Sequence, residues 1–213
     1  MGTVILARHG EAEGNSTHRL IGWADVALTS AGHEQARRLA DRLAGAPIDR
    51  IVSSDLRRAT QTAAPLVAAT GLELETDARL REIDNGDWTD LAPEQISAGW
   101  SDMWQSYVDG VDVDRPNGER WADVRERVIE AVAGLLAQDG LTVVFTHGGP
   151  LLLSAYWASG TSLQGNIFKG PLAPSLNASV CTLVEGPRVL GYNDVGHLTA
   201  VADLDIPYAP VFE

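Results

Sequence analysis

Three short apolar runs, each ending abruptly in polar or charged residues, constrain the fold of this chain more than any other feature. They lie at residues 4–6, 48–53 and 141–145, and amphipathic helical patterns separate them. Short apolar runs of this kind are typical of fully buried strands. Strands that alternate with helices indicate an α/β protein, which we expect to be a three-layer α/β/α sandwich with a mostly parallel central sheet.

The same patterns place the remaining elements. Apolar residues recur at helical spacing over about 29–45, 55–71, 119–138 and 151–159. Further strands are expected at 72–76, 180–184 and 189–192, the last two as a closing hairpin. Residues 11–28 predict a long loop over the strand ends, 84–118 a helical insertion over the site, and 199–213 an acidic tail. We therefore expect a single domain over residues 1–213.

Charge and cysteine content limit the partners and the compartment. The formal net charge of -13 argues against nucleic acid or an anionic membrane as partner, because both would be repelled by most of the surface. Cys181 is the only cysteine, which excludes a disulfide framework and fits a reducing cytoplasm. Neither a signal-like segment nor an apolar run of the roughly 18 residues of a membrane span is present. The sequence leaves a homodimer open.

Cations and imidazoles follow three of the predicted strands. Arg8 and His9 end the first, a turn at 53–58 with two arginines ends the second, and His147 ends the run at 141–145. Ligands of parallel sheets sit outside the carboxyl ends of the strands, so these groups should converge. Arginines beside bare imidazoles would oppose a divalent metal, whereas they suit the oxygens of a phosphoryl group. A histidine is the competent nucleophile among them.

Four ordered blocks extend this pattern into a family resemblance. They are Arg8-His9-Gly10-Glu11, the run SSDLRRATQTA at 53–63, Leu80-Arg81-Glu82 and His147-Gly148-Gly149. Over roughly residues 4–197 the sequence resembles the histidine phosphatase superfamily, in the branch that holds cofactor-dependent phosphoglycerate mutases and their phosphatase relatives. The resemblance implies a phosphoglycerate mutase-like fold and a small phosphate ester as substrate, with neither a metal nor another cofactor.

The resemblance also implies a role for each matched residue. His9 would be the phosphorylated nucleophile and Glu82 the proton donor to the leaving alcohol. The phosphoryl oxygens would be held by Arg8, Arg58, His147 and Asn15. Arg57 is the weaker candidate for holding the phosphoryl oxygens, since the family pattern uses the arginine directly before an alanine.

Substrate contacts beyond the phosphate are expected from the loop at 19–25 and the helix after His147. They are Ile21, Gly22 and Gly148. Trp104 belongs to an aromatic cluster over residues 100–107 that either lines an apolar substrate pocket or packs in a core, and both interpretations stay open.

Departures from the mutases point to a phosphatase. Residues 80–85 lack the arginine-rich pattern with histidine and tyrosine that recognises phosphoglycerate in mutases, and Ile21 replaces a substrate-binding threonine. The acidic residues of the insertion would also repel a second anion. We therefore expect a metal-independent phosphomonoesterase that hydrolyses a small phosphorylated metabolite through a phosphohistidine, with a cofactor-dependent phosphoglycerate mutase as the alternative. A non-catalytic binding protein would need a lost catalytic residue, and every expected one is present.

Overall fold

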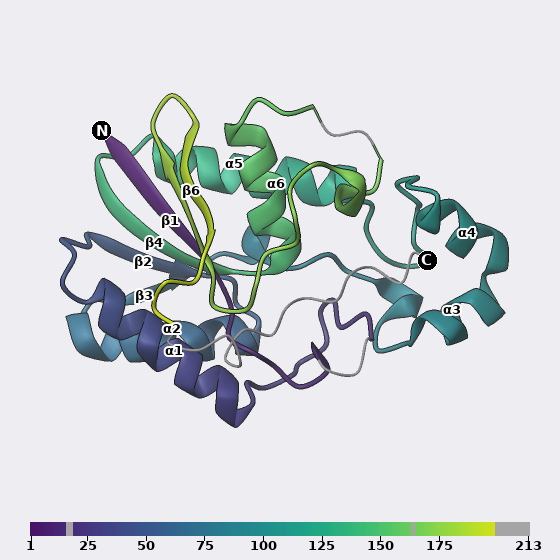
Figure 1. Ribbon diagram of the computed structural model, residues 1–213, viewed down its shortest axis with the longest axis horizontal. Helices are drawn as coiled ribbons and strands as arrows, with labels where there is room; N and C mark the ends of the chain where they lie inside the picture. The colour runs from purple at the N-terminus through teal and green to yellow at the C-terminus, as the bar shows by residue number, and fades with distance from the viewer. Residues whose placement is uncertain (16–18, 163–164, 199–213) are drawn as a thin grey trace.

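The computed structural model describes residues 1–15, 19–162 and 165–198. A six-stranded sheet forms its centre, in the order β3-β2-β4-β1-β5-β6 (Figure 1). The strands are β1 Gly2–Arg8, β2 Arg50–Ser53, β3 Leu74–Thr76, β4 Gly140–Thr146, β5 Val180–Val184 and β6 Arg188–Asp194. β3, β2, β4 and β1 pair in parallel, while the hairpin β5–β6 joins β1 in antiparallel orientation. The expected mostly parallel sheet is confirmed.

Helices cover both faces of the sheet, because successive strand side chains point to opposite sides. Val4 and Leu6 pack with α5 (Trp121–Leu136) and α6 (Gly148–Ala158) on one face. Ala7 packs with α1 (Ser30–Leu43) and α2 (Arg57–Thr70) on the other. Figure 1 shows these two layers above and below the sheet.

Two helices begin at different residues from those that the pattern predicts. α5 starts at Trp121 rather than near residue 119, because the Asp112 carboxylate accepts hydrogen bonds from the backbone N–H groups of Trp121 and Ala122. This carboxylate satisfies donors that every helix start leaves open. α6 starts at Gly148 directly after His147, three residues before the predicted start, since two glycines and a proline hide the helical pattern there.

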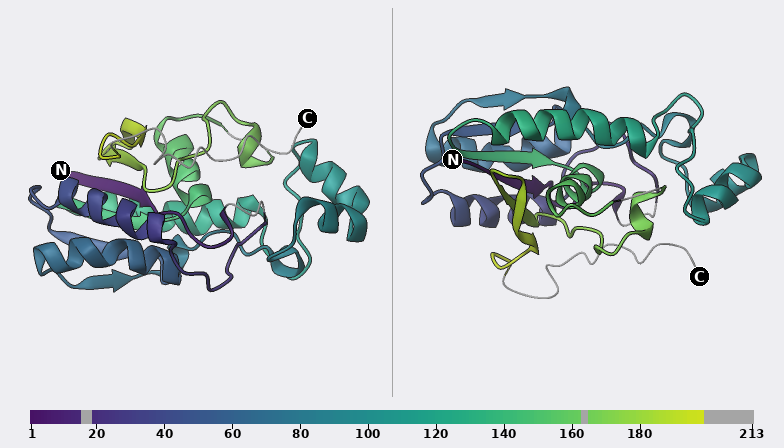
Figure 2. Two further views of the ribbon diagram at one scale, coloured as in Figure 1. Left: turned by 60° about the horizontal axis from the view of Figure 1, so that its bottom comes forward. Right: turned by 90° about the horizontal axis from the view of Figure 1, so that it is seen from above.

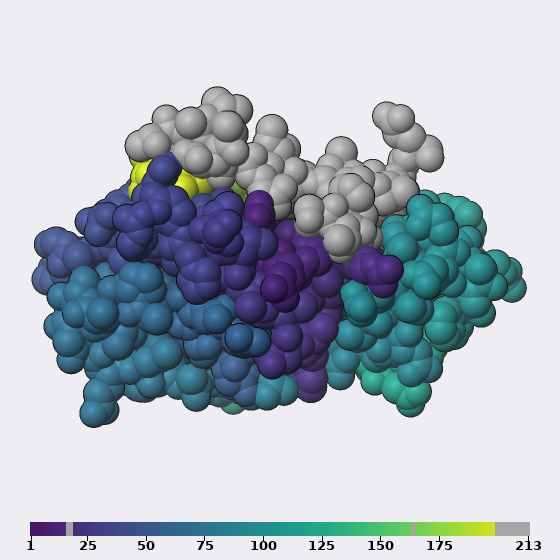
Figure 3. Space-filling model, turned by 90° about the horizontal axis from the view of Figure 1, so that it is seen from below, coloured from purple at the N-terminus to yellow at the C-terminus, as the bar shows by residue number. Residues whose placement is uncertain are grey.

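The predicted insertion consists of short helices with a small core of its own. α3 (Pro93–Gly99) and α4 (Ser101–Val108) pack around the buried side chains of Trp88, Ile96, Tyr107 and Val113. Figure 2 shows this unit beyond the ends toward which β3 and β4 point. Seen from below, the purple N-terminal segment lies between the blue α1–α2 layer and the teal insertion (Figure 3). The insertion therefore faces the end of the sheet where ligands are expected.

Short 3-10 helices and loops complete the described chain. The 3-10 helices are Ala78–Leu80, Gly86–Trp88 and Ile167–Lys169. Cys181 is buried in β5, and burial raises the pKa of its thiol to about 12. No helix in the described part of the chain is both long and apolar enough to cross a membrane. The acidic tail predicted at 199–213 lies outside the described residues.

Candidate active site

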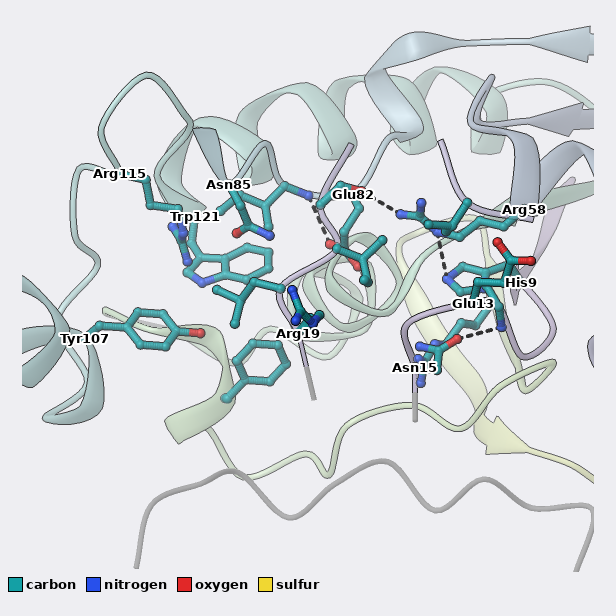
Figure 4. Close-up of a pocket in the computed structure, with 18 residues that line it drawn as sticks. His9, Glu13, Asn15, Arg19, Arg58, Glu82, Asn85, Tyr107, Arg115 and Trp121 are labelled. Atoms are coloured by element: carbon teal, nitrogen blue, oxygen red, sulfur yellow. Dashed lines mark hydrogen bonds between the residues drawn. The ribbon is translucent and has the colours of Figure 1, made fainter. Parts of the chain in front are cut away.

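A pocket of about 220 Å³ opens at the carboxyl ends of the central strands (Figure 4). The end of β1, the loop segments at 12–15 and 19–26, the first turn of α2 and the segment at 82–85 line it. Tyr107, Arg115, Trp121 and Phe168 complete its far wall. One cavity thus joins the strand ends to the helical insertion.

The hydrogen bonds of His9 fix its tautomer. Its Nδ1 lies 2.7 Å from the carbonyl oxygen of Gly10, and a carbonyl only accepts, so Nδ1 carries the proton. The Nε–H of Arg58 points at the other ring nitrogen, Nε2, over 3.2 Å. Nε2 therefore presents a lone pair, as a nucleophile requires.

Burial keeps the His9 ring neutral. Its pKa lies well below the usual 6.5, first because burial disfavours the imidazolium and then because Arg58 and Arg8 repel it. The backbone also holds the residue, since its N–H donates to Thr146 and its carbonyl accepts from Ala178. Next to it, a Cβ on Gly10 would lie 2.5 Å from the carbonyl oxygen of Gly32, so this close approach requires glycine.

Arg58 connects His9 to the loop that covers it. Its two Nη atoms donate to the carbonyls of Gly22 and Ala24, over 2.7 and 3.1 Å. The side chain is 2% exposed, and burial lowers its pKa to about 10. The neighbouring Arg57 is exposed, so the two adjacent arginines have opposite environments.

A second histidine lies directly behind the first. The rings of His147 and His9 meet edge to face with centroids 5.2 Å apart. His147 Nε2 lies 2.8 Å from Ser54 Oγ, and its Nδ1 has no hydrogen-bond partner among the described residues. Burial, followed by the repulsion of Arg58, lowers its pKa well below 6.5. Two neutral imidazoles beside two guanidiniums leave the local charge positive, as an incoming phosphoryl group requires.

Glu82 lines the pocket between His9 and Arg58 on one side and Arg115 and Trp121 on the other (Figure 4). One carboxylate oxygen accepts from Gly149 N–H at the start of α6, over 3.2 Å, and the other accepts from Ile83 N–H over 3.1 Å. A Cβ on Gly149 would lie 2.4 Å from Glu82 Oε1, so glycine makes room for the carboxylate.

Hydrogen bonds from two side chains fix the backbone around Glu82. Arg127 of α5 donates to the carbonyls of Arg79, Arg81 and Glu82, and it forms an ion pair with Glu119. The indole N–H of Trp23 donates to the same Glu82 carbonyl over 2.7 Å. These bonds hold the carboxylate at a defined place relative to the strand ends.

Asn15 is held by its neighbours. Its side-chain oxygen accepts from Ala12 N–H over 2.7 Å and from the amide of Asn177 over 3.3 Å. Its own amide N–H2 is thereby oriented by the hydrogen bonds of the oxygen. Asn177 precedes β5 and is buried, so the closing hairpin supports the loop from behind.

The structure brings most of the predicted residues to one cavity. Seven of them line it, namely Arg8, His9, Asn15, Ile21, Gly22, Arg58 and Glu82. His147 and Gly148 lie beside these groups but outside the lining. Trp104 packs against Trp88 and Tyr107 in the core of the insertion, and the pocket is lined instead by Tyr107 from the same cluster.

Several residues that line or support the pocket were not predicted from the sequence. Arg115, Trp121 and Phe168 line the far wall, while Arg127 and Asn177 support the site. Trp121 lies at the start of α5, so the amphipathic pattern of that helix could have predicted its burial. Nothing in the sequence around Arg115 indicates that it is buried. Within the described ranges no group of three or more His, Cys, Asp and Glu side chains is arranged to hold a metal ion.

The chain is similar to a known protein family over most of its length. The family model of the histidine phosphatase superfamily (branch 1) matches residues 4–192. The probable phosphoglycerate mutase GpmB of Proteus mirabilis (strain HI4320) is 35% identical over 162 residues, which cover 76% of this chain and 73% of that protein. The protein of the same name from Serratia proteamaculans (strain 568) is 32% identical over 148 residues, covering 68% and 69%.

Several solved structures have a similar fold, and two of them illustrate the degree of similarity. Bacillus stearothermophilus YhfR has a TM-score of 0.82 at 30% identity, with 92% of this chain and 98% of that chain covered. The mycobacterial glucosyl-3-phosphoglycerate phosphatase in complex with VO3 has a TM-score of 0.79 at 30% identity, with 91% and 99% covered. The fold is therefore shared along nearly the whole chain.

Proposed function

The chain belongs to branch 1 of the histidine phosphatase superfamily, and on that basis we propose that it hydrolyses a small phosphate monoester through a phosphohistidine at His9. The observation that carries the proposal is the neutral His9 ring with its proton on Nδ1 and its Nε2 lone pair facing the guanidinium of Arg58. Such a ring can attack phosphorus without first losing a proton.

In the first half of the reaction, Nε2 of His9 bonds to phosphorus as the bond to the ester oxygen breaks. The carbonyl of Gly10 stabilises the resulting positive ring through Nδ1–H. Arg8 and Arg58 stabilise charge on the phosphoryl oxygens. Glu82, protonated in this step, gives its proton to the leaving oxygen, because an alkoxide leaves poorly.

In the second half, the carboxylate of Glu82 takes a proton from water as the water oxygen bonds to phosphorus. The bond between phosphorus and Nε2 breaks, and the ring regains its lone pair. Inorganic phosphate and the starting enzyme result. Every proton moves between Glu82, the leaving oxygen and water, so we propose that the reaction is metal-independent and continues in EDTA.

A phosphoglycerate mutase remains the second candidate, because curated relatives carry that name. A mutase would return the phosphoryl group from His9 to the product rather than to water. The absence of mutase-type cations in residues 80–85 favours hydrolysis. Isomerisation of 3-phosphoglycerate that depends on bisphosphoglycerate, faster than phosphate release, would overturn the hydrolase in favour of the mutase.

The test of the nucleophile is turnover of p-nitrophenyl phosphate by His9→Ala. We expect at least a thousandfold loss, together with loss of an acid-labile, base-stable phosphoprotein in rapidly quenched reactions. His33→Ala is the matched control, since that histidine is exposed on α1. Activity retained by His9→Ala would exclude the mechanism.

A further inference from the structure

The far end of the pocket contains a second arginine, Arg115, which the phosphoryl chemistry does not use. It is 2% exposed, as closed off from solvent as Arg58, yet it lines the same cavity. Figure 4 shows Arg115 with Trp121 and Tyr107 on one side of Glu82, and Arg58 with His9 on the other. Glu82 also interacts electrostatically with both arginines. The general acid thus lies between two cationic ends.

Arg115 has no carboxylate partner within ion-pair distance among the described residues. Its Nη1 donates to the carbonyl of Glu119 over 3.0 Å, and its guanidinium is hydrogen-bonded to the hydroxyl of Tyr107. Its Nε has no hydrogen-bond partner there. The nearby Asp112 already accepts from two backbone N–H groups of α5. Asp112 and Glu82 attract this buried cation from a distance, but it lacks the direct ion pair that buried charges normally have.

Aromatic rings around Arg115 provide part of that compensation. The guanidinium carbon lies 5.2 Å from the ring centre of Tyr107, 5.4 Å from Trp121 and 5.7 Å from Trp88. Cation–π contacts orient the charge but give the Nε–H donor no hydrogen-bond acceptor. The indole N–H of Trp121 also lacks a partner among the described residues, so this end offers donors and few acceptors.

From this arrangement, and resting on the proposed function, we propose that Arg115 binds a carboxylate on the alcohol part of the substrate. The leaving oxygen must reach Glu82, so the rest of the alcohol extends toward the far wall. There a carboxylate meets the charge of the Arg115 guanidinium, and the N–H groups of Arg115 Nε and Trp121 Nε1 have no other acceptor among the described residues. The rings of Tyr107 and Phe168 line the space for the connecting carbon chain. Although the insertion is acidic overall, it contributes this cation to the pocket lining.

The test uses phosphonates, which bind but are not hydrolysed. Binding of 3-phosphonopropionate, 4-phosphonobutyrate and 5-phosphonopentanoate is measured by calorimetry, each against its carboxyl methyl ester. For at least one chain length we expect the free acid to bind tenfold more tightly or better. Arg115→Met should reduce that difference to less than twofold. Arg120→Met is the control, because Arg120 is exposed in the same segment and should leave the difference unchanged.

The outcomes separate the two proposals. Equal binding of acid and ester at every length, or a difference that survives in Arg115→Met, would overturn the carboxylate site alone. Failure of every phosphonate to bind would overturn the phosphate site of the proposed function and this inference with it. If circular dichroism shows that Arg115→Met does not fold, the wild-type comparison decides together with Arg115→Lys, which retains the charge and should retain part of the preference.

Discussion

The two ends of the pocket are built in different ways from similar residues. At the phosphate end, Arg58 and His9 come from a helix start and a strand end that the parallel sheet brings together. At the far end, Arg115 and Tyr107 come from an insertion whose position depends on aromatic packing. Sheet topology thus determines where the proposed phosphate site lies, whereas side-chain packing determines which groups line the rest of the pocket.

The largest expected effect belongs to the phosphate end. Arg58→Ala removes the donor to His9 Nε2 and the bonds to Gly22 and Ala24. We expect kcat/KM for p-nitrophenyl phosphate to fall about 100- to 1,000-fold, about 2.7–4 kcal/mol. Arg57→Ala changes the same residue type one position earlier and should stay within about twofold, because that side chain is exposed. Equal losses in the two variants would contradict the proposal that Arg58 holds the phosphoryl group.

The next largest effect concerns Glu82, which lies between the two ends of the pocket. Glu82→Gln keeps the shape but removes the proton, and we expect kcat for an alkyl phosphate to fall about 100-fold or more. p-Nitrophenyl phosphate should lose far less, since its leaving group needs little protonation. The ratio of the two losses is the measurement. A uniform loss for both substrates would show that Glu82 binds the phosphate instead of protonating the alcohol.

The sequence predicted which side chains of the phosphate end lie together, because these groups follow strands directly. A buried run that ends in Arg8 and His9 places both at the carboxyl edge of any parallel sheet. The far end was not predictable in that way. Arg115 lies between a proline and an aspartate in an irregular segment, and only the packing of Trp88, Tyr107 and Trp121 around it makes it buried.

The same contrast explains the aromatic cluster of the insertion. Trp104 and Tyr107 lie three residues apart on α4, and the sequence gives no reason to separate core from pocket. In the structure Tyr107 lines the cavity, whereas Trp104 packs on Trp88. Which of two neighbouring aromatic residues reaches the pocket depends on how the insertion packs, and no local pattern encodes this.

A third, smaller effect distinguishes the ends by pH. Burial lowers the pKa of His9, His147 and His197 below 6.5. Below that pH the unfolded chain takes up protons that the folded protein does not, so stability falls as pH decreases. Each histidine contributes up to about 1.4 kcal/mol per pH unit. At the far end, burial raises the pKa of Tyr107 from 10, so it contributes nothing in this range.

Urea unfolding at pH 7.0 and 5.5 measures this dependence. His9→Gln should lose roughly a third of the decrease, because one of the three histidines whose pKa is lowered no longer titrates. An unchanged decrease in His9→Gln would show that His9 is not held neutral, which would also weaken the argument for its role as nucleophile.

The smallest expected effect tests whether the two ends are mechanically joined. Gly149 lies where they meet, since a Cβ there would lie 2.4 Å from Glu82 Oε1 and 2.6 Å from Trp121 Cζ3. Gly149→Ala must therefore displace the acid or the indole, and we expect kcat/KM to fall about tenfold, about 1.4 kcal/mol. Gly134→Ala is the control, because that glycine is exposed on α5 with nothing within 4 Å of a Cβ. It should stabilise the protein by about 0.5–1 kcal/mol without changing turnover. If Gly149→Ala weakens phosphonate binding but leaves the dependence on leaving group unchanged, the indole has moved and the acid has not. If activity is fully retained, neither contact limits turnover and the ends act independently.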